Sequence, residues 1–374
     1  MTPSPLIEAF VLKPLAAVYG LGTRWRNLFF DRGVLPCKHY PVPVICVGNI
    51  RVGGTGKTPM VEHLLHLLLK EGYRPAVVSR GYKRSTSGLQ IAHTSSSASE
   101  IGDEPRQIKQ KFPEVTIAID ANRRRAIDKL MTMPTEERPD VILLDDGFQH
   151  RYVQPSLAIL LTDHANLFYQ DKLLPWGRLR EGAEARYRAD IVVVTRCPSG
   201  LQPIDYSIME RNMALYAHQI LIFSQVAYST PLKVFPQGSQ TQKLPYMSRA
   251  ALAIAGIADP SKFYQALKHK IGDIQTVTFP DHHRFGASDA DRLNRAFGSL
   301  LGSTQPDKHP IAICTEKDAQ RLADIRHLLS PALIDNLYYL PIHVSFRDYG
   351  QNSLDQAVLK HLRQFGKEHS NPYN

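Results

Sequence analysis

The fold of this chain is decided by the stretch Val44-Ile45-Cys46-Val47-Gly48-Asn49-Ile50-Arg51-Val52-Gly53-Gly54-Thr55-Gly56-Lys57-Thr58-Pro59. A short apolar run is followed by closely spaced glycines and then by a lysine, a threonine and a proline. Glycine lets the backbone curl so that successive N–H groups point inward at an anion. Proline suits the first turn of a helix, whose N-terminus also favours an anion. The stretch therefore predicts a strand, a phosphate-binding loop (P-loop) and a helix, in that order.

The side chains of this loop suit a nucleotide and its metal ion. The ammonium group of Lys57 can reach the outer phosphates, and the hydroxyl of Thr58 can bind Mg²⁺. Apolar residues then recur at helical spacing over 60–70. The predicted phosphate-binding residues are Gly53, Gly54, Thr55, Gly56, Lys57 and Thr58.

Two positions depart from the known P-loop patterns. The usual pattern has glycine at the position of Arg51, and the variant found in partitioning and metal-delivery ATPases has lysine at the position of Val52. The alternative interpretation is a glycine-rich turn with a chance Gly-Lys-Thr. The order of apolar run, loop and helix favours the P-loop.

Composition restricts the class of protein. A length of 374 residues predicts two domains with sizeable cores. The net charge of +10 predicts an anionic partner, which can be a nucleotide, a phosphorylated substrate, a nucleic acid or a membrane. The four cysteines are scattered and form no metal-binding pair, which indicates buried free thiols in a reducing compartment.

The first thirty residues are apolar, basic and aromatic. Their apolar positions have helical spacing, but Lys13 and Pro14 interrupt them, so the segment is too short and too charged to span a bilayer. Arginines and aromatic residues alternate over 24–32, as in segments that lie at an anionic membrane surface. An amphipathic helix that packs on its own domain is the alternative.

The rest of the chain predicts an α/β fold, a P-loop NTPase-like α/β/α sandwich with a mostly parallel sheet. Continuous apolar runs over 75–79, 115–120, 141–146, 157–163 and 191–196 are typical of parallel strands that are buried on both faces. A second alternation of strands and helices begins near residue 251 and predicts a smaller α/β domain. The predicted parts are a membrane-interface helix over 1–35, a nucleotide-binding domain over 36–225, a β linker over 226–250 and the smaller domain over 251–374.

Carboxylates occur at the end of one of these runs and after a polar loop near residue 100. Asp145 and Asp146 end the apolar run over 141–146, where a carboxylate beside a P-loop can hold Mg²⁺, although an Asp-Asp-Gly turn is the alternative. Asp103 and Glu104 precede a proline, so they predict either a helix start or a base and a metal contact. His282 lies in a second-domain loop and is either a proton carrier or a hydrogen-bonded loop residue.

Taken together and in order, these motifs make the chain resemble the tetraacyldisaccharide 4′-kinase family. The resemblance covers nearly the whole chain and rests on Gly53-Gly54-Thr55-Gly56-Lys57-Thr58-Pro59, Ser79-Arg80-Gly81-Tyr82, Gly102-Asp103-Glu104-Pro105, Asp145-Asp146-Gly147-Phe148-Gln149-His150, Gly177-Arg178-Leu179-Arg180-Glu181, Asp281-His282 and Thr315-Glu316-Lys317-Asp318. It implies phosphorylation of the 4′-hydroxyl of a tetraacyl glucosamine disaccharide 1-phosphate, which makes lipid IVA in lipid A biosynthesis. It also implies ATP and Mg²⁺, an acylated disaccharide phospholipid partner, no nucleic acid, and a peripheral place on the anionic cytoplasmic face of the inner membrane.

The resemblance also implies roles for residues. Asp103 and His282 act as a base pair that takes the proton of the sugar hydroxyl, with Lys57 as a third catalytic residue. Thr58, Glu104, Asp145 and Asp146 are the candidate metal ligands, with their roles undivided. The candidate substrate contacts are Arg80, Tyr82, Asn122, Arg123, Arg180 and Glu181.

Two other functions stay open at this point. A P-loop ATPase of the partitioning or metal-delivery type would use hydrolysis to drive a conformational switch, but it relies on a lysine where this chain has Val52. A membrane-associated scaffold with a degenerate nucleotide site is disfavoured because Lys57, Thr58 and Asp145 are all present.

Overall fold

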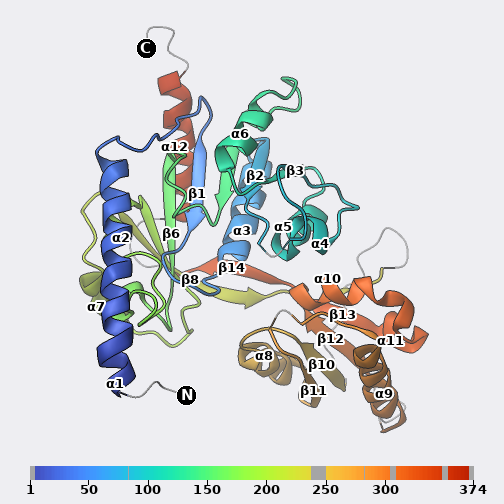
Figure 1. Cartoon of the computed structure of the whole chain (residues 1–374). Helices are drawn as coiled ribbons and strands as arrows, with labels where there is room; N and C mark the ends of the chain where they lie inside the picture. Colours follow the sequence, from blue (N-terminus) through green and yellow to red (C-terminus); the bar gives the residue numbers. More distant parts are fainter. Residues whose placement is uncertain are drawn as a thin grey trace. The chain divides into compact units, whose positions relative to one another are not determined.

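The computed structural model describes residues 5–82, 84–236, 250–281, 283–303, 309–347 and 353–369. The chain divides into two compact units (Figure 1). Unit 1 comprises Met1–Val226 and Val344–Asn374, and unit 2 comprises Ala227–His343.

Unit 1 is built on a large, mostly parallel sheet. Within the described residues the sheet has nine strands in the order β14-β8-β7-β6-β1-β5-β2-β4-β3. The central strands pair in parallel. Of the strand pairs in this sheet whose register the structure describes, only the pair of the short edge strand β3 with β4 is antiparallel. The strands are β1 (Val44–Gly48), β2 (Pro75–Ser79), β3 (Gln90–Ile91), β4 (Thr116–Ile119), β5 (Val141–Asp145), β6 (Leu157–Asp163), β7 (Ile191–Thr195), β8 (Ile220–Tyr228) and β14 (Ile342–Phe346).

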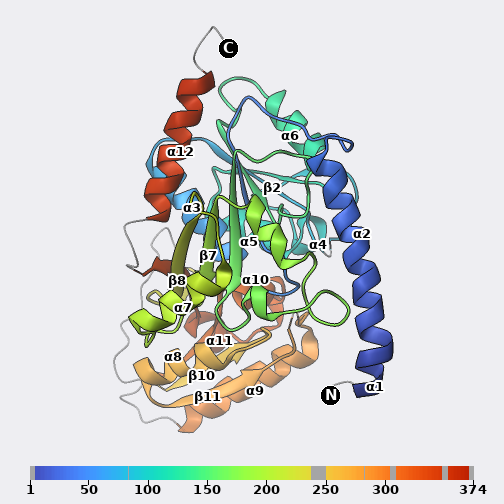
Figure 2. The same cartoon turned by 90° about the vertical axis from the view of Figure 1, so that its left-hand side faces the viewer.

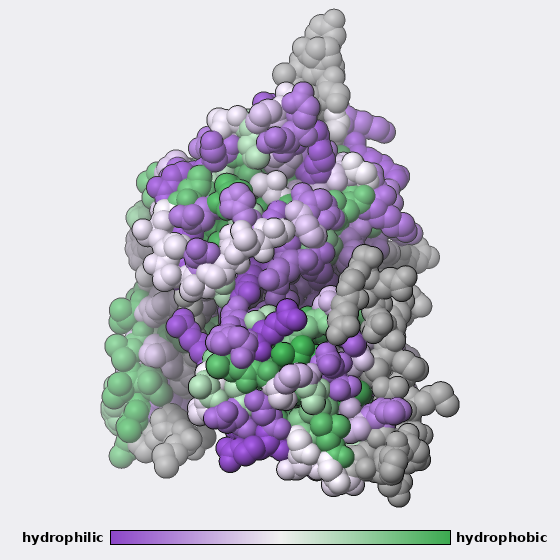
Figure 3. All heavy atoms as spheres, turned by 90° about the vertical axis from the view of Figure 1, so that its right-hand side faces the viewer, coloured by the Kyte–Doolittle hydropathy of each residue, from purple (hydrophilic) through white to green (hydrophobic). Residues whose placement is uncertain are grey.

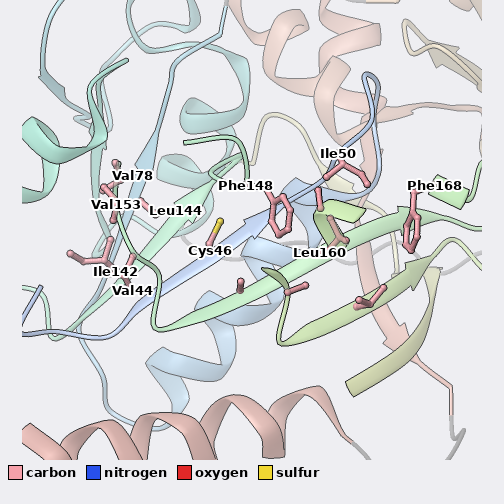
Figure 4. Close-up of a cluster of buried hydrophobic side chains, with 14 of the residues drawn as sticks. Val44, Cys46, Ile50, Val78, Ile142, Leu144, Phe148, Val153, Leu160 and Phe168 are labelled. Carbon is pink, nitrogen blue, oxygen red and sulfur yellow. The ribbon is translucent and has the colours of Figure 1, made fainter. Parts of the chain in front are cut away.

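Helices cover both faces of this sheet. Alternate residues of each strand belong to different hydrophobic clusters, as the pleat of a strand requires. Figure 4 shows one cluster, which includes Val44, Cys46 and Leu160 of the strands as well as Phe148 and Phe168. The helices of unit 1 outside its N-terminal segment are α3 (Lys57–Lys70), α4 (Ala98–Ile101), α5 (Asp103–Lys111), α6 (Arg123–Met131), η2 (Phe168–Gln170), η3 (Ala183–Arg188), α7 (Pro203–Met213) and α12 (Leu354–His369).

The C-terminal helix α12 belongs to unit 1. Its residues Leu354, Val358 and Leu362 are buried in the same cluster as α3, although the sequence had placed 251–374 in the smaller domain. The reason is the path of the chain, which leaves unit 1 along β8 and returns along β14, its neighbour in the sheet. Apolar spacing alone identifies a helix but not the surface on which it packs.

The N-terminal segment forms one helical stretch along the side of unit 1 (Figure 2). It consists of α1 (Pro5–Ile7), a π-helical turn η1 (Glu8–Leu12) and α2 (Lys13–Asp31). Pro14 lies in the first turn of α2, where a missing backbone N–H is tolerated. No helix within the described part of the chain is long and apolar enough to cross a membrane.

Unit 2 is a smaller α/β unit. Its described residues form a five-stranded sheet in the order β11-β10-β12-β13-β9, which is parallel except at β9. The strands are β9 (Leu232–Lys233), β10 (Ala251–Ala255), β11 (Ile274–Thr278), β12 (Ile311–Thr315) and β13 (Leu337–Leu340). The helices are α8 (Ser261–Ile271), α9 (Ala287–Ser303), α10 (Glu316–Asp324), η4 (Arg326–Leu328) and α11 (Pro331–Asn336).

The predicted α/β fold with a mostly parallel sheet is confirmed. Its P-loop strand and helix lie where the sequence placed them, because the apolar run and the glycines define both ends. The predicted linker over 226–250 lies outside the described residues for most of its length, at 237–249.

Candidate active site

The P-loop connects the end of β1 to the start of α3. Gly53 has φ of 116° and Gly56, the N-cap of α3, has φ of 83°. Side chains disfavour this left-handed region, so glycine is needed at both positions. The loop leads directly to Lys57, whose side chain is 11% exposed, and to the buried Thr58.

Hydrogen bonds from two buried polar side chains hold the P-loop in place. The side-chain amide of Asn49 donates to Thr55 Oγ1 at 2.9 Å, and Thr195 Oγ1 at the end of β7 donates to the carbonyl of Thr55 at 2.9 Å. Because these bonds fix the carbonyl side of the loop, its N–H side is left to bind an anion.

Arg51 fits the position where glycine is usual. Its backbone is not among the described residues with left-handed φ, and its guanidinium bonds Asp171 at 2.7 Å and Asn166 at 2.9 Å. The next residue, Val52, donates its N–H to the carbonyl of Arg178 at 2.8 Å. The turn that contains Arg178 therefore braces the entrance of the P-loop.

Asp146 faces the cationic side of the site. Its carboxylate lies 3.5 Å from Lys57 Nζ and 3.2 Å from Arg180 Nη1. Burial raises the pKa of Asp146, but Lys57 and Arg180 outweigh burial and hold the pKa below its usual range. Asp146 is therefore a carboxylate at neutral pH, and it orients the lysine of the P-loop.

Asp145 has a different environment. It is buried, one oxygen accepts a hydrogen bond from Ser79 at 3.1 Å, and Oδ1 has no hydrogen-bond partner among the described residues. Burial and the nearby charges of Glu104 and Asp146 raise its pKa to about 7, against the opposing effect of Lys57. A buried carboxylate oxygen without a partner among the described residues, close enough to the P-loop to feel the charge of Lys57, suits a hard cation such as Mg²⁺.

Glu104 and Asp103 begin α5, and both are half-buried. Helix α5 is tied to the P-loop helix through the buried Glu62 of α3, which accepts hydrogen bonds from Gln107 and Lys111. The charge of Glu104 acts on Asp145, so α5 brings a third carboxylate toward the end of β5. Within the described residues, no group of three or more His, Cys, Asp or Glu side chains forms a complete metal site. Mg²⁺ commonly takes only one or two carboxylates and completes its shell with phosphates and water.

Cations gather at the ends of β2 and β5 and at the start of α6. Arg123 is buried, and burial together with Arg80 lowers its pKa, while Asp146 and Asp145 oppose this effect. His150 lies among arginines, and burial together with Arg123, Arg124, Arg26 and Arg80 lowers its pKa to about 4. His150 is therefore neutral at pH 7, and its buried Nε2 has no hydrogen-bond partner among the described residues.

His150 and Gln149 were not predicted as site residues, although the sequence placed them in the motif that follows β5. Gln149 accepts from Arg180 at 3.2 Å and donates to the carbonyl of Asn49 at 2.7 Å. The signal was their position just after a strand that ends in two carboxylates.

Three residues that were predicted as substrate contacts have the following surroundings in the structure. Asn122 is the N-cap of α6 and accepts from the N–H of Arg125 at 3.3 Å. Glu181 is buried, with Arg188 at 2.7 Å and Asn27 of α2 at 3.2 Å. Tyr82 is 71% exposed at the end of the turn that follows β2.

His282 lies outside the described residues, but the residues around it in unit 2 are well held. Phe279 stacks on His283, which bonds Asp289 at 2.9 Å. In the Thr315–Asp318 motif, Asp318 is buried and accepts from the N–H of Gly256 at 2.8 Å and from Thr315 Oγ1. This motif therefore caps α10 and joins two strand ends of unit 2.

The sheet, the P-loop and the carboxylates after β5 define the class of P-loop nucleotide-binding proteins. The family described as LpxK: Tetraacyldisaccharide-1-P 4′-kinase matches residues 8–363, and the chain belongs to this family.

Similar proteins agree with this assignment. A tetraacyldisaccharide 4′-kinase of Parabacteroides distasonis is 43% identical over 361 residues, covering 96% of each chain. One of Porphyromonas gingivalis is 46% identical over 334 residues, covering 89% of this chain and 91% of that protein. The crystal structure of "apo" form LpxK from Aquifex aeolicus in complex with ATP has a TM-score of 0.69 and 27% identity, covering 94% of this chain and 97% of that one. The predicted family and enzyme class, a kinase with an alcohol group as acceptor, are confirmed.

The two carboxylates predict opposite responses to mutation. An unfolded Asp145 ionises near pH 3.8, whereas the folded residue has a pKa of about 7, so the wild type loses stability as pH rises between these values. Asp145→Asn removes this loss. We expect its stability gain over the wild type in urea unfolding to grow by about 1–3 kcal/mol from pH 5 to pH 8.

Asp146→Asn is the matched control. The pKa of Asp146 is lowered, so its stabilising charge is fully present above pH 4 and is lost only as pH falls through the folded pKa. Asp146→Asn should therefore lose stability at both pH 5 and pH 8, and the loss should be smaller at pH 8 only to the extent that removing Asp146 lowers the pKa of Asp145. A gain for Asp145→Asn that did not change with pH would contradict the description of Asp145.

Proposed function

We propose that this chain transfers the γ-phosphoryl group of ATP to the 4′-hydroxyl of a tetraacyl glucosamine disaccharide 1-phosphate. The proposal rests on membership of the family and, above all, on one geometric observation. Lys57 of the P-loop lies 3.5 Å from Asp146, next to a buried Asp145 that keeps one oxygen without a partner. A cation for phosphate and an oxygen ligand for a metal ion thus stand side by side, as phosphoryl transfer requires.

The P-loop binds the phosphates of ATP. Its backbone N–H groups between Gly53 and Gly56 surround the phosphate oxygens, and Lys57 neutralises charge on the β- and γ-phosphates. Arg180, which shares Asp146 with Lys57, stands 3.2 Å from that carboxylate. Because Asp146 balances both cations, they stay oriented before ATP arrives.

The oxygen groups nearby suit Mg²⁺. Thr58 and Asp145 would hold the ion, with Glu104 and Asp146 near it, and the bound ion would neutralise charge on the phosphates as it develops. Asp145 must lose its proton to act as a ligand, and its pKa of about 7 makes that loss easy near neutral pH.

Asp103 and His282 are the proposed base for the sugar hydroxyl. Asp103 begins α5 one residue before Glu104, so one helix start supplies a group for proton transfer and a group for the metal region. His282 comes from unit 2. Its part in the proposed base rests on the family resemblance, since it lies outside the described residues.

The cations at the ends of β2 and β5 are the proposed sites for the anionic sugar substrate. Arg80 and Arg123 act on His150, whose neutral ring can donate or accept one hydrogen bond. We assign Asn122 and Glu181 a supporting part, because Asn122 caps α6 and Glu181 links Arg188 to α2. Tyr82 is exposed and remains a proposed contact for the lipid.

The N-terminal helix is the proposed contact with the anionic cytoplasmic face of the inner membrane. Its small residues Ala16 and Gly20 are buried, whereas large apolar side chains such as Phe10 (76% exposed) and Val18 (68% exposed) face solvent. Figure 3 shows hydrophobic residues along the lower left edge of that view, where the helix begins. Lys13, Arg24 and Arg32 are exposed on the same helix and suit anionic head groups.

A switch ATPase fits the loop less well. The lysine on which that class relies is Val52 here, and its N–H is bonded to the turn at Arg178. A bonded, apolar position cannot supply a mobile cation to a second nucleotide site.

Transfer of label from γ-labelled ATP to an acylated glucosamine disaccharide 1-phosphate tests the function. We expect labelled phospholipid with the wild type and a rate about a thousandfold lower with Lys57→Ala, because the variant lacks a charge that stabilises the transferring group. Lys70→Ala, at the exposed end of the same helix, is the matched control and should keep its rate. Free phosphate as the sole labelled product would favour the switch ATPase.

A double-mutant cycle tests the base. Asp103→Ala and His282→Ala should each lower turnover strongly, and the double variant should lose little more than the worse single variant, because each group depends on the other. Binding of an ATP analogue should hardly change. His269→Ala, an exposed histidine of α8, is the control. Fully additive losses would show two independent roles.

Co-flotation with anionic vesicles tests the membrane contact. The double variant Phe10→Asp and Val18→Asp should float less than the wild type and keep its unfolding temperature, since both side chains are exposed. High salt should release part of the wild type. The control is Ile204→Asp with Ile208→Asp, two exposed apolar residues of α7. An equal loss in the control would refute a specific role for the N-terminal helix.

A further inference from the structure

The end of β7 contacts the P-loop from the side opposite to the carboxylates. Thr195 Oγ1 donates to the carbonyl of Thr55 at 2.9 Å, and Arg196 Nη1 donates to the carbonyl of Gly54 at 2.7 Å. Two successive residues of β7 and its loop thus bond two successive carbonyls of the phosphate loop.

Arg196 has a backbone conformation that its side chain disfavours. Its φ is 58°, in the left-handed region where glycine is the usual residue. The neighbouring bonds enforce it, since the carbonyl of Thr195 accepts from the N–H of His164 at 2.9 Å and the N–H of Cys197 donates to Ser224 at 2.9 Å. Backbone strain of this kind persists where the surrounding structure fixes it, and it is common at functional sites.

The strand order indicates which part of a nucleotide would lie there. In the sheet, strands β5 and β2, which position Asp145 and Ser79, are on one side of β1, and β6 and β7 are on the other. Figure 1 shows β2 and β6 on opposite sides of β1. In the proposed function, Lys57 and the carboxylates bind the outer phosphates, and Lys57 lies 3.5 Å from Asp146, which follows β5. A nucleotide is a linear chain of phosphates, ribose and base, so the base must extend away from β5, over the ends of β6 and β7. Arg196 lies at that end.

The charge of Arg196 is already balanced. Nη1 also bonds Asp163 Oδ2 at 2.7 Å, and the side chain of Asp163 is only 10% exposed. A guanidinium that is paired with a carboxylate gains less from a phosphate than a free one would. Its hydrogen bonds lie in its plane, so its faces are left for stacking, and 38% of the side chain is exposed.

We propose that Arg196 is a nucleotide-binding residue whose guanidinium stacks on the base of the bound nucleotide. The proposal rests on the proposed binding of ATP by the P-loop. It names the base rather than the phosphates as the partner, because of the pairing with Asp163 and the position beyond β6. Planar stacking of this kind would favour nucleotides over bare polyphosphate.

Binding of two ligands separates these roles. We would measure the dissociation constants of ATP and of inorganic tripolyphosphate, both with Mg²⁺, by calorimetry on the full chain. Arg196→Ala should weaken ATP about tenfold, within the range known for stacking on a base, and should change tripolyphosphate less than about twofold. Arg196→Lys, which keeps the charge but not the plane, should weaken ATP in the same direction with tripolyphosphate unchanged.

Two further variants control for backbone strain at position 196 and for the loss of an exposed arginine. Arg196→Gly loses the same ion pair with Asp163 as Arg196→Ala but suits the left-handed backbone, so it should lose ATP affinity to the same extent and have a higher unfolding temperature than Arg196→Ala. Arg138→Ala removes an exposed arginine that also bonds a carbonyl, that of Met133, and should change neither ligand.

Equal weakening of both ligands would overturn the proposal, because it would show a phosphate contact or a damaged loop. Unchanged ATP binding in Arg196→Ala would overturn it as well. Failure of the wild type to bind ATP would instead contradict the proposed function, so the two failures are distinguishable.

Discussion

Asp145 and Asp146 are adjacent in the chain, with Asp145 buried and Asp146 partly buried, so ionising both at once is costly. The structure resolves this conflict by surrounding them differently. Asp146 has Lys57 and Arg180 for its charge, whereas Asp145 has one hydroxyl and one oxygen without a partner among the described residues. The proposed phosphoryl transfer depends on this difference, because one carboxylate orients the lysine and the other has an oxygen that can bind a metal ion.

Close packing makes the arrangement possible. A side chain at Gly48 would meet the backbone nitrogen of Phe148 at 2.9 Å, so the strand that enters the P-loop and the turn after the carboxylates can touch only because this residue is glycine. Glu62 of the P-loop helix accepts a hydrogen bond from α5, the helix that begins with Asp103 and Glu104. The three chain segments that carry the proposed chemistry are therefore fixed to one another inside unit 1, and small displacements in one would be felt in the others.

Local sequence patterns predicted much of the fold and of the candidate site. They did not predict which side chains from distant parts of the chain contact one another. The glycines and apolar runs identified the P-loop, the parallel strands and the paired carboxylates because those features are contiguous in the chain. Glu181 was predicted as a substrate contact, but its partners Arg188 and Asn27 come from separate elements, and spacing does not reveal such pairs. The environment of His150 is another example, since its arginines come from α2, the turn after β2 and α6. The role of His282 stays a prediction.

Proton release on metal binding tests most directly whether Asp145 gives up a proton to become a metal ligand. Mg²⁺ would be titrated into the protein with an ATP analogue at pH 6.5, in two buffers of different ionisation enthalpy. We expect the wild type to release a fraction of one proton, and this fraction should decline above pH 7. Asp145→Asn should release no proton and should bind Mg²⁺ more weakly. Two results together would contradict this role of Asp145. The wild type would bind Mg²⁺ without pH-dependent release of a proton from the protein, and Asp145→Asn would bind Mg²⁺ with the same affinity as the wild type.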